Sequence, residues 1–242
     1  VGWFGPFGVL PEYQGRGLGK ALMAESLAYL RQSVNLIGLE TMPESPYNLG
    51  LYLKEGFQAG WMTFILSKDL EREAVADLSL PCWSSADPTT RQRWLSELQQ
   101  GSLSISPGYD YTKEIISLAK HEAGETLVLL KQDRAIGMCT VLLKNPRQGS
   151  PDETASLEQL FIHPDDTDAA GFHTLLQASE NLARAQNKRM LNLFVNARHS
   201  WALKQALEWG YRVQRARLRL TLEGSQEATT PDNLVNCSTW AG

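Results

Sequence analysis

Several features are scarce in this sequence, and each scarcity excludes a class of protein. The only cysteines, Cys82, Cys139 and Cys237, lie far apart and show neither a CxxC pair nor a cysteine–histidine spacing. This argues against a zinc site and against a disulfide framework. We therefore expect no metal ion and a reducing, cytoplasmic location.

A net positive charge and long apolar runs are absent as well. The formal net charge is -4, so the chain offers no basic field that would hold a nucleic-acid backbone. No apolar run approaches the roughly 18 residues of a membrane helix, and no charged-then-apolar leader is present. The sequence therefore predicts neither nucleic-acid binding nor membrane insertion.

The composition that remains is that of a folded globular protein. Of the 242 residues, 43% are hydrophobic and 21% are charged, which suffices for two ordinary domains, or one large one, with a real core. The chain opens without Met, directly in a strand-like apolar run. This opening indicates a fragment or a trimmed product.

The apolar pattern predicts an α/β chain in which strands and helices alternate. Ser45 is the expected N-cap of a short helix, with Pro46 at its first position. The expected strands are 3–10, 35–42, 61–68, 156–164, 190–195 and 213–222, with a hairpin of 126–130 and 136–143. The expected helices are 17–32, 47–55, 89–99, 168–186 and 200–209.

The order of these elements repeats. Strand, proline, turn, helix, strand, helix, glycine, aromatic residue and strand occur over residues 3–68, the first copy, and over residues 156–222, the second copy. Such a repeat indicates two like domains in tandem. Only the second copy carries a hairpin in front, so we expect the first to be incomplete at its N-terminus.

The predicted boundaries follow from this repeat. Residues 1–70 form the C-terminal part of a first domain, and residues 71–107 form a linker with one helix leading into the second domain. Residues 108–223 form the second domain, and residues 224–242 a loose polar tail.

A glycine-rich turn joins the first strand to the first helix. Gly15, Gly17 and Gly19 allow unusual backbone angles and close approach of a ligand. Free amides at a helix N-terminus form an anion cradle, and Arg16 and Lys20 add positive charge, so a pyrophosphate would fit. Tight strand–helix packing explains the glycines equally well. The spacing matches neither the dinucleotide-binding G-x-G-x-x-G pattern nor a Walker A loop.

Two segments resemble a known family. VLPEYQGRGLGKAL, residues 9–22, is similar to the acetyl-CoA signature Q/R-x-x-G-x-G/A of the GCN5-related N-acetyltransferase (GNAT) superfamily. NLGLYLKEGF, residues 48–57, resembles a second segment of that family, with Asn, Tyr, Lys and Gly-Phe in the family's order. The match covers residues 1 to about 68, whereas the second copy is similar in pattern only.

The resemblance implies a fold and a cofactor site. The fold would be a mixed twisted sheet flanked by helices, in two tandem copies. Acetyl-CoA would lie in a V-shaped opening between two splayed parallel strands that end near Val9 and Met42. Its pyrophosphate would be held by amides of the glycine turn and its pantetheine by Val9 and Asn48. The implied binding residues are Val9, Gln14, Gly15, Arg16, Gly17, Leu18, Gly19, Lys20 and Asn48.

The resemblance also implies that Tyr52 stands near the thioester sulfur as general acid. A departing thiolate with a pKa of about 8.5 leaves more easily when a phenol protonates it. The alternative is a packed helix tyrosine with its hydroxyl in water. No base is evident: Glu40 and Glu44 are the nearest candidates, and a structural role suits them as well.

The second copy departs from this signature. Aligning Pro164 with Pro11 places residues 167–173 at the glycine turn, where one glycine remains out of register. Asp165, Asp166 and Asp168 bring negative charge that would oppose a phosphate. Ala206 stands at the tyrosine position, and Asn196, Glu158 and His163 are candidate remnants of a site. We expect this copy to have lost its cofactor site and to serve packing, the covering of sheet edges or the acceptor pocket.

The function predicted from these motifs is N-acetyl transfer. Acetyl would pass from acetyl-CoA to a primary amine of an unidentified acceptor by direct attack. The expected partners are acetyl-CoA and the amine, with packing between the two domains and a dimer as a further option. The alternative is a non-catalytic module that binds acyl-CoA or a protein partner through the retained fold.

Overall fold

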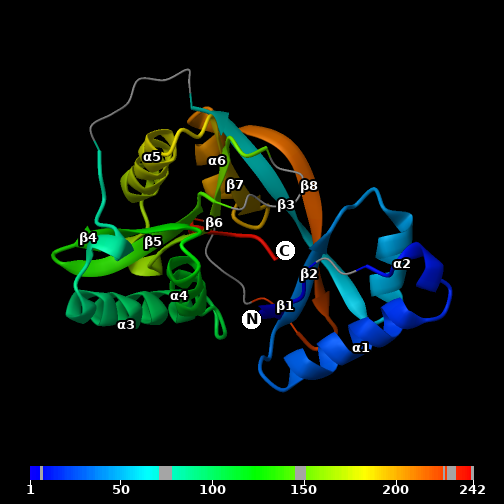
Figure 1. Ribbon diagram of the computed structural model, residues 1–242. Helices are drawn as coiled ribbons and strands as arrows, with labels where there is room; N and C mark the ends of the chain where they lie inside the picture. The colour runs from blue at the N-terminus through cyan, green and yellow to red at the C-terminus, as the bar shows by residue number, and fades with distance from the viewer. Residues whose placement is uncertain (6–7, 71–77, 145–150, 226, 228–232, 241–242) are drawn as a thin grey trace. The chain divides into compact units, whose positions relative to one another are not determined.

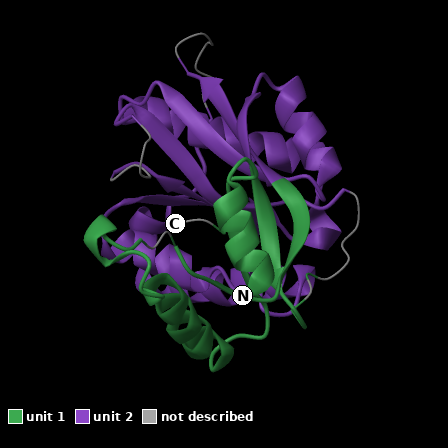
Figure 2. Ribbon diagram, turned by 90° about the vertical axis from the view of Figure 1, so that its right-hand side faces the viewer, with its two compact units in different colours: residues 1–62, 217–227, 240–242 green, residues 63–216, 228–239 purple. Residues whose placement is uncertain are grey.

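The computed structural model describes residues 1–5, 8–70, 78–144, 151–225, 227 and 233–240 (Figure 1). They form two compact units, shown in two colours in Figure 2. Unit 1 comprises Val1–Met62, Arg217–Glu227 and Trp240–Gly242, and unit 2 comprises Thr63–Ala216 and Ala228–Thr239. Neither unit is continuous in sequence.

Unit 1 is built on strands in the order β1-β2-β8-β3. These are β1 (Gly2–Trp3), β2 (Ile37–Thr41), β8 (Arg212–Leu222) and β3 (Phe57–Asp69), of which β8 and β3 also run into unit 2. Strand β1 pairs parallel with β2, and β2 pairs antiparallel with β8. The helical elements of this unit are η1 (Pro11–Tyr13), α1 (Leu18–Arg31) and α2 (Pro46–Lys54).

The core of unit 1 lies between α1 and one face of the sheet. Alternation along β2 puts Ile37 and Leu39 on this face, where they pack with Met23 and Leu27 of α1. The remaining buried members of the cluster are Phe57, Leu220 and Leu222. Strand β8 therefore supplies part of the core beneath α1.

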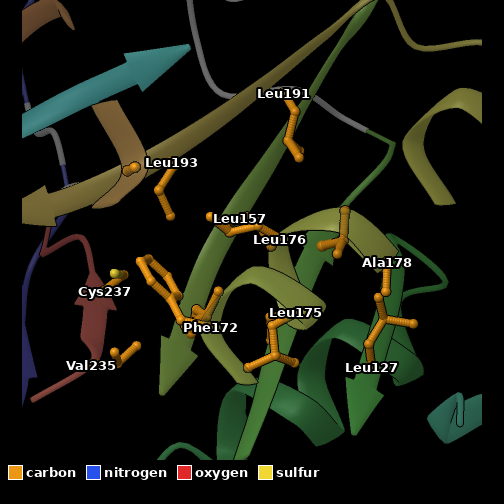
Figure 3. Close-up of a cluster of buried hydrophobic side chains, with 14 of the residues drawn as sticks. Leu127, Leu157, Phe172, Leu175, Leu176, Ala178, Leu191, Leu193, Val235 and Cys237 are labelled. Carbon is orange, nitrogen blue, oxygen red and sulfur yellow. The ribbon is translucent and has the colours of Figure 1, made fainter. Parts of the chain in front are cut away.

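Unit 2 contains strands in the order β3-β7-β6-β5-β4, with β9 paired to β6. The strands are β4 (Gly124–Lys131), β5 (Arg134–Leu142), β6 (Thr154–Ile162), β7 (Met190–Asn196) and β9 (Asn236–Ser238). The helical elements are η2 (Trp83–Ser85), α3 (Pro88–Ile105), α4 (Thr112–Lys120), η3 (Pro164–Asp166), α5 (Ala169–Ala185) and α6 (Ser200–Glu208). Figure 3 shows how side chains of α5, β4, β6 and β7 meet those near β9 in one buried cluster.

The last strand of each predicted copy pairs with a strand of the other copy. In unit 2, β3 pairs antiparallel with β7 from Thr63 opposite Asn196 to Asp69 opposite Met190. In unit 1, β8 pairs with β2 from Gly38 opposite Thr221 to Thr41 opposite Leu218. The sequence pattern predicted both strands but not this exchange of partners.

Two expectations from the sequence are wrong. The strand expected over residues 3–10 is reduced to Gly2–Trp3, and residues 6–7 lie outside the described residues. The tail expected to be loose contains β9, and Leu234, Val235, Cys237 and Trp240 are buried there. The cause is the apolar side chains near the C-terminus: Val235 and Cys237 pack into the core of unit 2, and the Trp240 ring packs against Arg219. Residues 228–232 and 241–242 lie outside the described residues.

Candidate active site

The glycine turn adopts a conformation that favours glycine. Gly15 and Gly17 both have φ of 76°, in the left-handed region that other residues adopt at a cost. A Cβ atom at either position would meet nothing within 4 Å, whereas one at Gly19 would lie 3.8 Å from Val9 Cγ2. Gly15 and Gly17 are therefore needed for the path of the backbone and not for close packing.

The turn leaves backbone donors exposed at the start of α1. Gly17 is the N-cap and provides no side-chain cap, and the first helical bond runs from Ala21 N–H to Gly17 O at 3.1 Å. Among the described residues, the amides of 15–20 find no hydrogen-bond acceptor. Unpaired amides at the positive end of a helix dipole are a binding site for an anion.

Cationic side chains flank these amides. Lys20 Nζ lies 3.1 Å from Glu55 Oε1, and the lysine side chain is two-thirds exposed. The Arg16 guanidinium lies over the Tyr13 ring, 5.6 Å from its centroid. Both cations are at the surface, where either can turn towards a phosphate.

A side chain of the turn makes a hydrogen bond to the backbone just before it. Gln14 Nε2 donates to the Val9 carbonyl oxygen at 2.9 Å. That carbonyl is therefore engaged, while the Val9 N–H finds no acceptor among the described residues. Of the two polar groups at Val9, the N–H is the one left for a ligand.

The pairing of β1 with β2 is short. Their parallel pairing comprises Gly2 opposite Ile37 and Trp3 opposite Gly38. From Leu39 to Thr41, β2 has β8 as its partner, and no described residue after Trp3 pairs with it on the β1 side. Beyond Gly38, the β1 side of β2 therefore has no strand partner among the described residues.

Helix α2 carries the predicted Asn48 and Tyr52. Ser45 is the N-cap, as expected, and its Oγ accepts from the Asn48 N–H at 3.4 Å. Tyr52 is half-buried, with its ring 5.9 Å from that of Phe57 in an edge-to-face contact. Three residues later, on the same side of the helix, Glu55 contacts Lys20 at the start of α1.

The Tyr52 hydroxyl remains a proton donor over the physiological range. Partial burial raises the pKa of this phenol above its usual 10.0, because the phenolate would lose hydration. The hydroxyl has no hydrogen-bond partner among the described residues. It is therefore protonated at neutral pH and available to another group.

Neither candidate base is well placed. Glu40 is buried, and its Oε1 accepts from Arg219 Nε at 2.9 Å and Nη2 at 2.8 Å, which occupies the carboxylate. Glu44 is exposed in the turn before α2. The sequence analysis did not predict a role for Arg219. Its position between Leu218 and Leu220 on an expected strand could have drawn attention to it.

The corresponding place in the second copy is closed by its own side chain. Asp168 is the N-cap of α5, and its Oδ1 accepts from the Gly171 N–H at 2.6 Å. Asp166 pairs with Lys131 at 2.8 Å and with Arg134, and the hydrogen bond from Lys131 helps to hold its pKa below the usual range. The carboxylates are thus held by partners within the unit.

The candidate remnants in the second copy have structural partners. The Asn196 side chain is buried and donates to Thr63 Oγ1 at 3.0 Å, and His163 Nδ1 accepts from the Asp165 N–H at 3.2 Å. Ala206 is fully buried in the core. Glu158 is half-buried on β6.

The three thiols are poor nucleophiles. Burial raises the pKa of Cys139 and of Cys237 to about 12, and burial with the nearby Glu125 charge also raises that of Cys82. All three cysteines are free. Within the described ranges, no group of three or more His, Cys, Asp or Glu side chains is arranged to hold a metal ion, and no helix there is long and apolar enough to cross a membrane.

Comparison with known proteins shows what parts of the chain are similar to. Residues 1–57 match the model of the acetyltransferase (GNAT) family, whereas no curated protein matches the sequence. A putative acetyltransferase from Pyrococcus horikoshii matches with a TM-score of 0.66 and 17% identity, over 98% of this chain and 70% of that one. A GCN5-related N-acetyltransferase from Sphaerobacter thermophilus matches with a TM-score of 0.57 and 14% identity, over 92% and 74%.

A third solved structure bears on the predicted repeat. A tandem GNAT protein from the clavulanic acid biosynthesis pathway matches with a TM-score of 0.57 and 15% identity, over 91% of this chain and 74% of that one. At such identities the likeness shows the fold. The resemblance to the GNAT family is confirmed for residues 1–57, and the α/β fold, a mixed twisted sheet flanked by helices, is confirmed for the chain; the two-copy arrangement stays a prediction.

Proposed function

We propose that this protein transfers an acetyl group from acetyl-CoA to a primary amine through the site in unit 1. The observation that carries the proposal is the contrast between two helix N-termini. At α1 the amides of 15–20 are open under an uncapped turn, whereas α5 is closed by Asp168. Bound acetyl-CoA would supply the activated thioester and the leaving thiolate.

The chain's own groups have separate roles in this proposal. The amides from Gly15 to Lys20 bind the pyrophosphate, next to Gln14, whose own N–H donates to the Pro11 carbonyl, and the exposed cations of Arg16 and Lys20 add attraction. The Val9 N–H and the Asn48 side chain orient the pantetheine. Tyr52 Oη gives its proton to the departing sulfur, which its raised pKa permits at neutral pH.

Direct attack by the amine is favoured over a covalent enzyme intermediate. A cysteine nucleophile reacts as the thiolate, and the pKa values of Cys82, Cys139 and Cys237 are all raised. Because Glu40 is held by Arg219, we assign the removal of the amine proton to water. The free cysteines also fit a reducing, cytoplasmic location.

The second copy is proposed to be a degenerate acetyltransferase-like domain with a structural role. At the N-terminus of α5, the Gly171 amide is already bonded to the Asp168 side chain. Ala206, at the position that corresponds to Tyr52, is buried and has no group that could donate a proton. Its last strand, β8, instead pairs with β2 and places Leu220 and Leu222 beneath α1. In this role the second copy completes the sheet that carries the cofactor site.

Calorimetry followed by a thiol-release assay tests this function. We expect the chain to bind acetyl-CoA and CoA, and to release CoA thiol from acetyl-CoA with at least one member of a panel of primary amines. Binding without thiol release across the panel would favour the non-catalytic acyl-CoA-binding module. Absence of binding at about 1 mM ligand, the upper end of ordinary KM values, would overturn the cofactor site.

A further inference from the structure

Arg219 stands at the centre of a buried ion-pair cluster in unit 1. Its Nε and Nη2 donate to Glu40 Oε1, and its Nη1 donates to Glu227 Oε1 at 2.9 Å. The Arg219 side chain is 2% exposed and that of Glu40 is 0% exposed. Removing one partner of such a buried pair leaves a charge without compensation, so the geometry is strongly held.

The pair joins two residues that face each other across the strands. Glu40 on β2 lies directly opposite Arg219 on β8, and the adjacent pair, Leu39 opposite Leu220, points into the core with α1. A slip of one residue would turn Leu39 away from the core and Glu40 into it. The ion pair and the leucine pair therefore specify the same register from opposite faces of the sheet.

Trp240 lies on the same face of the sheet as Glu40 and supports the Arg219–Glu40 ion pair, which we call the clamp. The Arg219 guanidinium lies over its ring, 4.1 Å from the centroid, a distance at which the cation attracts the aromatic face. A Cβ at Gly38 would come within 2.5 Å of this ring, so the tryptophan rests directly on the β2 backbone. Gly38 is also the last residue of β2 that pairs with β1.

This position links the clamp to the proposed cofactor opening. Beyond Gly38, no described residue pairs with β2 on the β1 side, and β8 is the strand that holds residues 39–41 within the described part of unit 1. We propose that Arg219, which lies in the second copy, is a positioning residue for the acetyl-CoA opening formed by the first copy. It acts through Glu40 by holding β2 in register beyond Gly38, just before α2 with Asn48 and Tyr52, and the ligand in this inference rests on the proposed function.

Substitution of the arginine, with a matched buried pair as control, tests the clamp. Arg219→Leu removes the charge, and Arg219→Lys keeps it with fewer donors. Lys68→Met breaks the Lys68–Glu180 pair of unit 2, whose side chains are 8% and 6% exposed. Hydrogen exchange at residues 39–41 and the calorimetric dissociation constant of CoA are measured for each variant, alongside thermal unfolding.

We expect Arg219→Leu to accelerate exchange at residues 39–41 and to weaken CoA binding about tenfold, within the range by which substitutions remote from a ligand change its affinity. Arg219→Lys is expected to recover most of both quantities, and Lys68→Met to leave both near those of the unaltered chain. If Arg219→Leu fails to fold, the test rests on the comparison of Arg219→Lys with Lys68→Met. Arg219→Lys should then show a small increase in exchange at residues 39–41 and a small loss of CoA affinity, and Lys68→Met should show neither.

Two results would overturn the inference. The first is unchanged exchange and CoA affinity in the Arg219 variants, and the second is an equal loss in Lys68→Met, which would mean general destabilisation. If the unaltered chain binds no CoA, the proposed function fails on its own. Exchange at residues 39–41 then still decides whether Arg219 holds β2 in register.

Discussion

A single side chain, Tyr52, carries the proton-donating role in the proposed reaction. Its ring is fixed by the edge-to-face contact with Phe57, while its hydroxyl makes no bond to a described residue. Packing and proton donation therefore reside in different atoms of the same residue. This separation makes the chemical role testable without disturbing the core.

Tyr52→Phe is expected to slow turnover and leave cofactor binding intact. The ring contact with Phe57 remains, and the lost hydroxyl leaves no described partner unpaired, so the thermal unfolding midpoint should hardly change. Loss of a positioned acid typically lowers the rate by about 100-fold or more. Steady-state kinetics should show a lower kcat with an unchanged KM for acetyl-CoA; an unchanged kcat would remove Tyr52 from the mechanism.

The pH profile of the unaltered protein follows from the same burial. Because the pKa of Tyr52 is raised above 10.0, loss of its proton should not reduce kcat below that pH. Any fall in activity towards acid pH is expected to follow protonation of the acceptor amine. A decline of kcat on the alkaline side between pH 7 and 9, absent in Tyr52→Phe, would contradict this assignment.

At the scale of elements, the N-termini of α1 and α5 show what distinguishes the two predicted copies. Both helices begin after a 3-10 turn that contains the aligned prolines, Pro11 and Pro164. Gly17 leaves the first helix uncapped, whereas Asp168 caps the other. The proposed difference in anion binding between the two helices thus depends on whether their N-terminal amides are already bonded.

Gly17→Asp tests the turn, with Gly224→Asp as its matched control. Both glycines belong to unit 1, have φ of 76° and 82°, and would meet nothing within 4 Å at Cβ. Both substitutions should therefore cost a similar strain, about 1 kcal/mol, seen as similar shifts in thermal unfolding. Calorimetry should show loss of CoA binding for Gly17→Asp alone, because its carboxylate repels phosphate; equal affinities in the two variants would reject the cradle.

At the scale of the whole molecule, the sequence predicts what is local and misses what is not. The bounds of α1, α2, β7 and α6 agree with expectation to within a residue or two, because caps such as Ser45 and the spacing of apolar residues act over a few positions. The partner of a strand is not a local property, so the exchange of β3 and β8 went unpredicted. The polar stretch before Leu234 likewise led to the prediction of a loose tail, in which the burial of Trp240 was not expected.

The candidate site follows the same division. The turn from Gln14 to Lys20 lies in one stretch of chain, and its motif predicted an anion cradle that the open amides fit. Whether the Glu40 carboxylate is available to act as a base depends on its hydrogen bonds with Arg219, which is 179 positions away. No spacing rule connects such residues, and the pairing of β2 with β8 has to be known first.

The exchange of strands predicts that the first copy cannot fold alone. A chain of residues 1–70 would lack Leu220 and Leu222 and would expose the β3 residues that pair with β7. Circular dichroism and heating should show no cooperative transition for this fragment, while the full chain unfolds cooperatively. A cooperative transition in the fragment would show that the exchanged strand is dispensable for unit 1.

Titration of the full chain with acetyl-CoA in a calorimeter tests the central claim most directly. The open amides at the start of α1 predict saturable binding of one acetyl-CoA per chain, weakened by high salt because phosphate charge is involved. The second, capped helix predicts that no second equivalent binds. Absence of heat at about 1 mM ligand, or two equivalent sites per chain, would contradict the account.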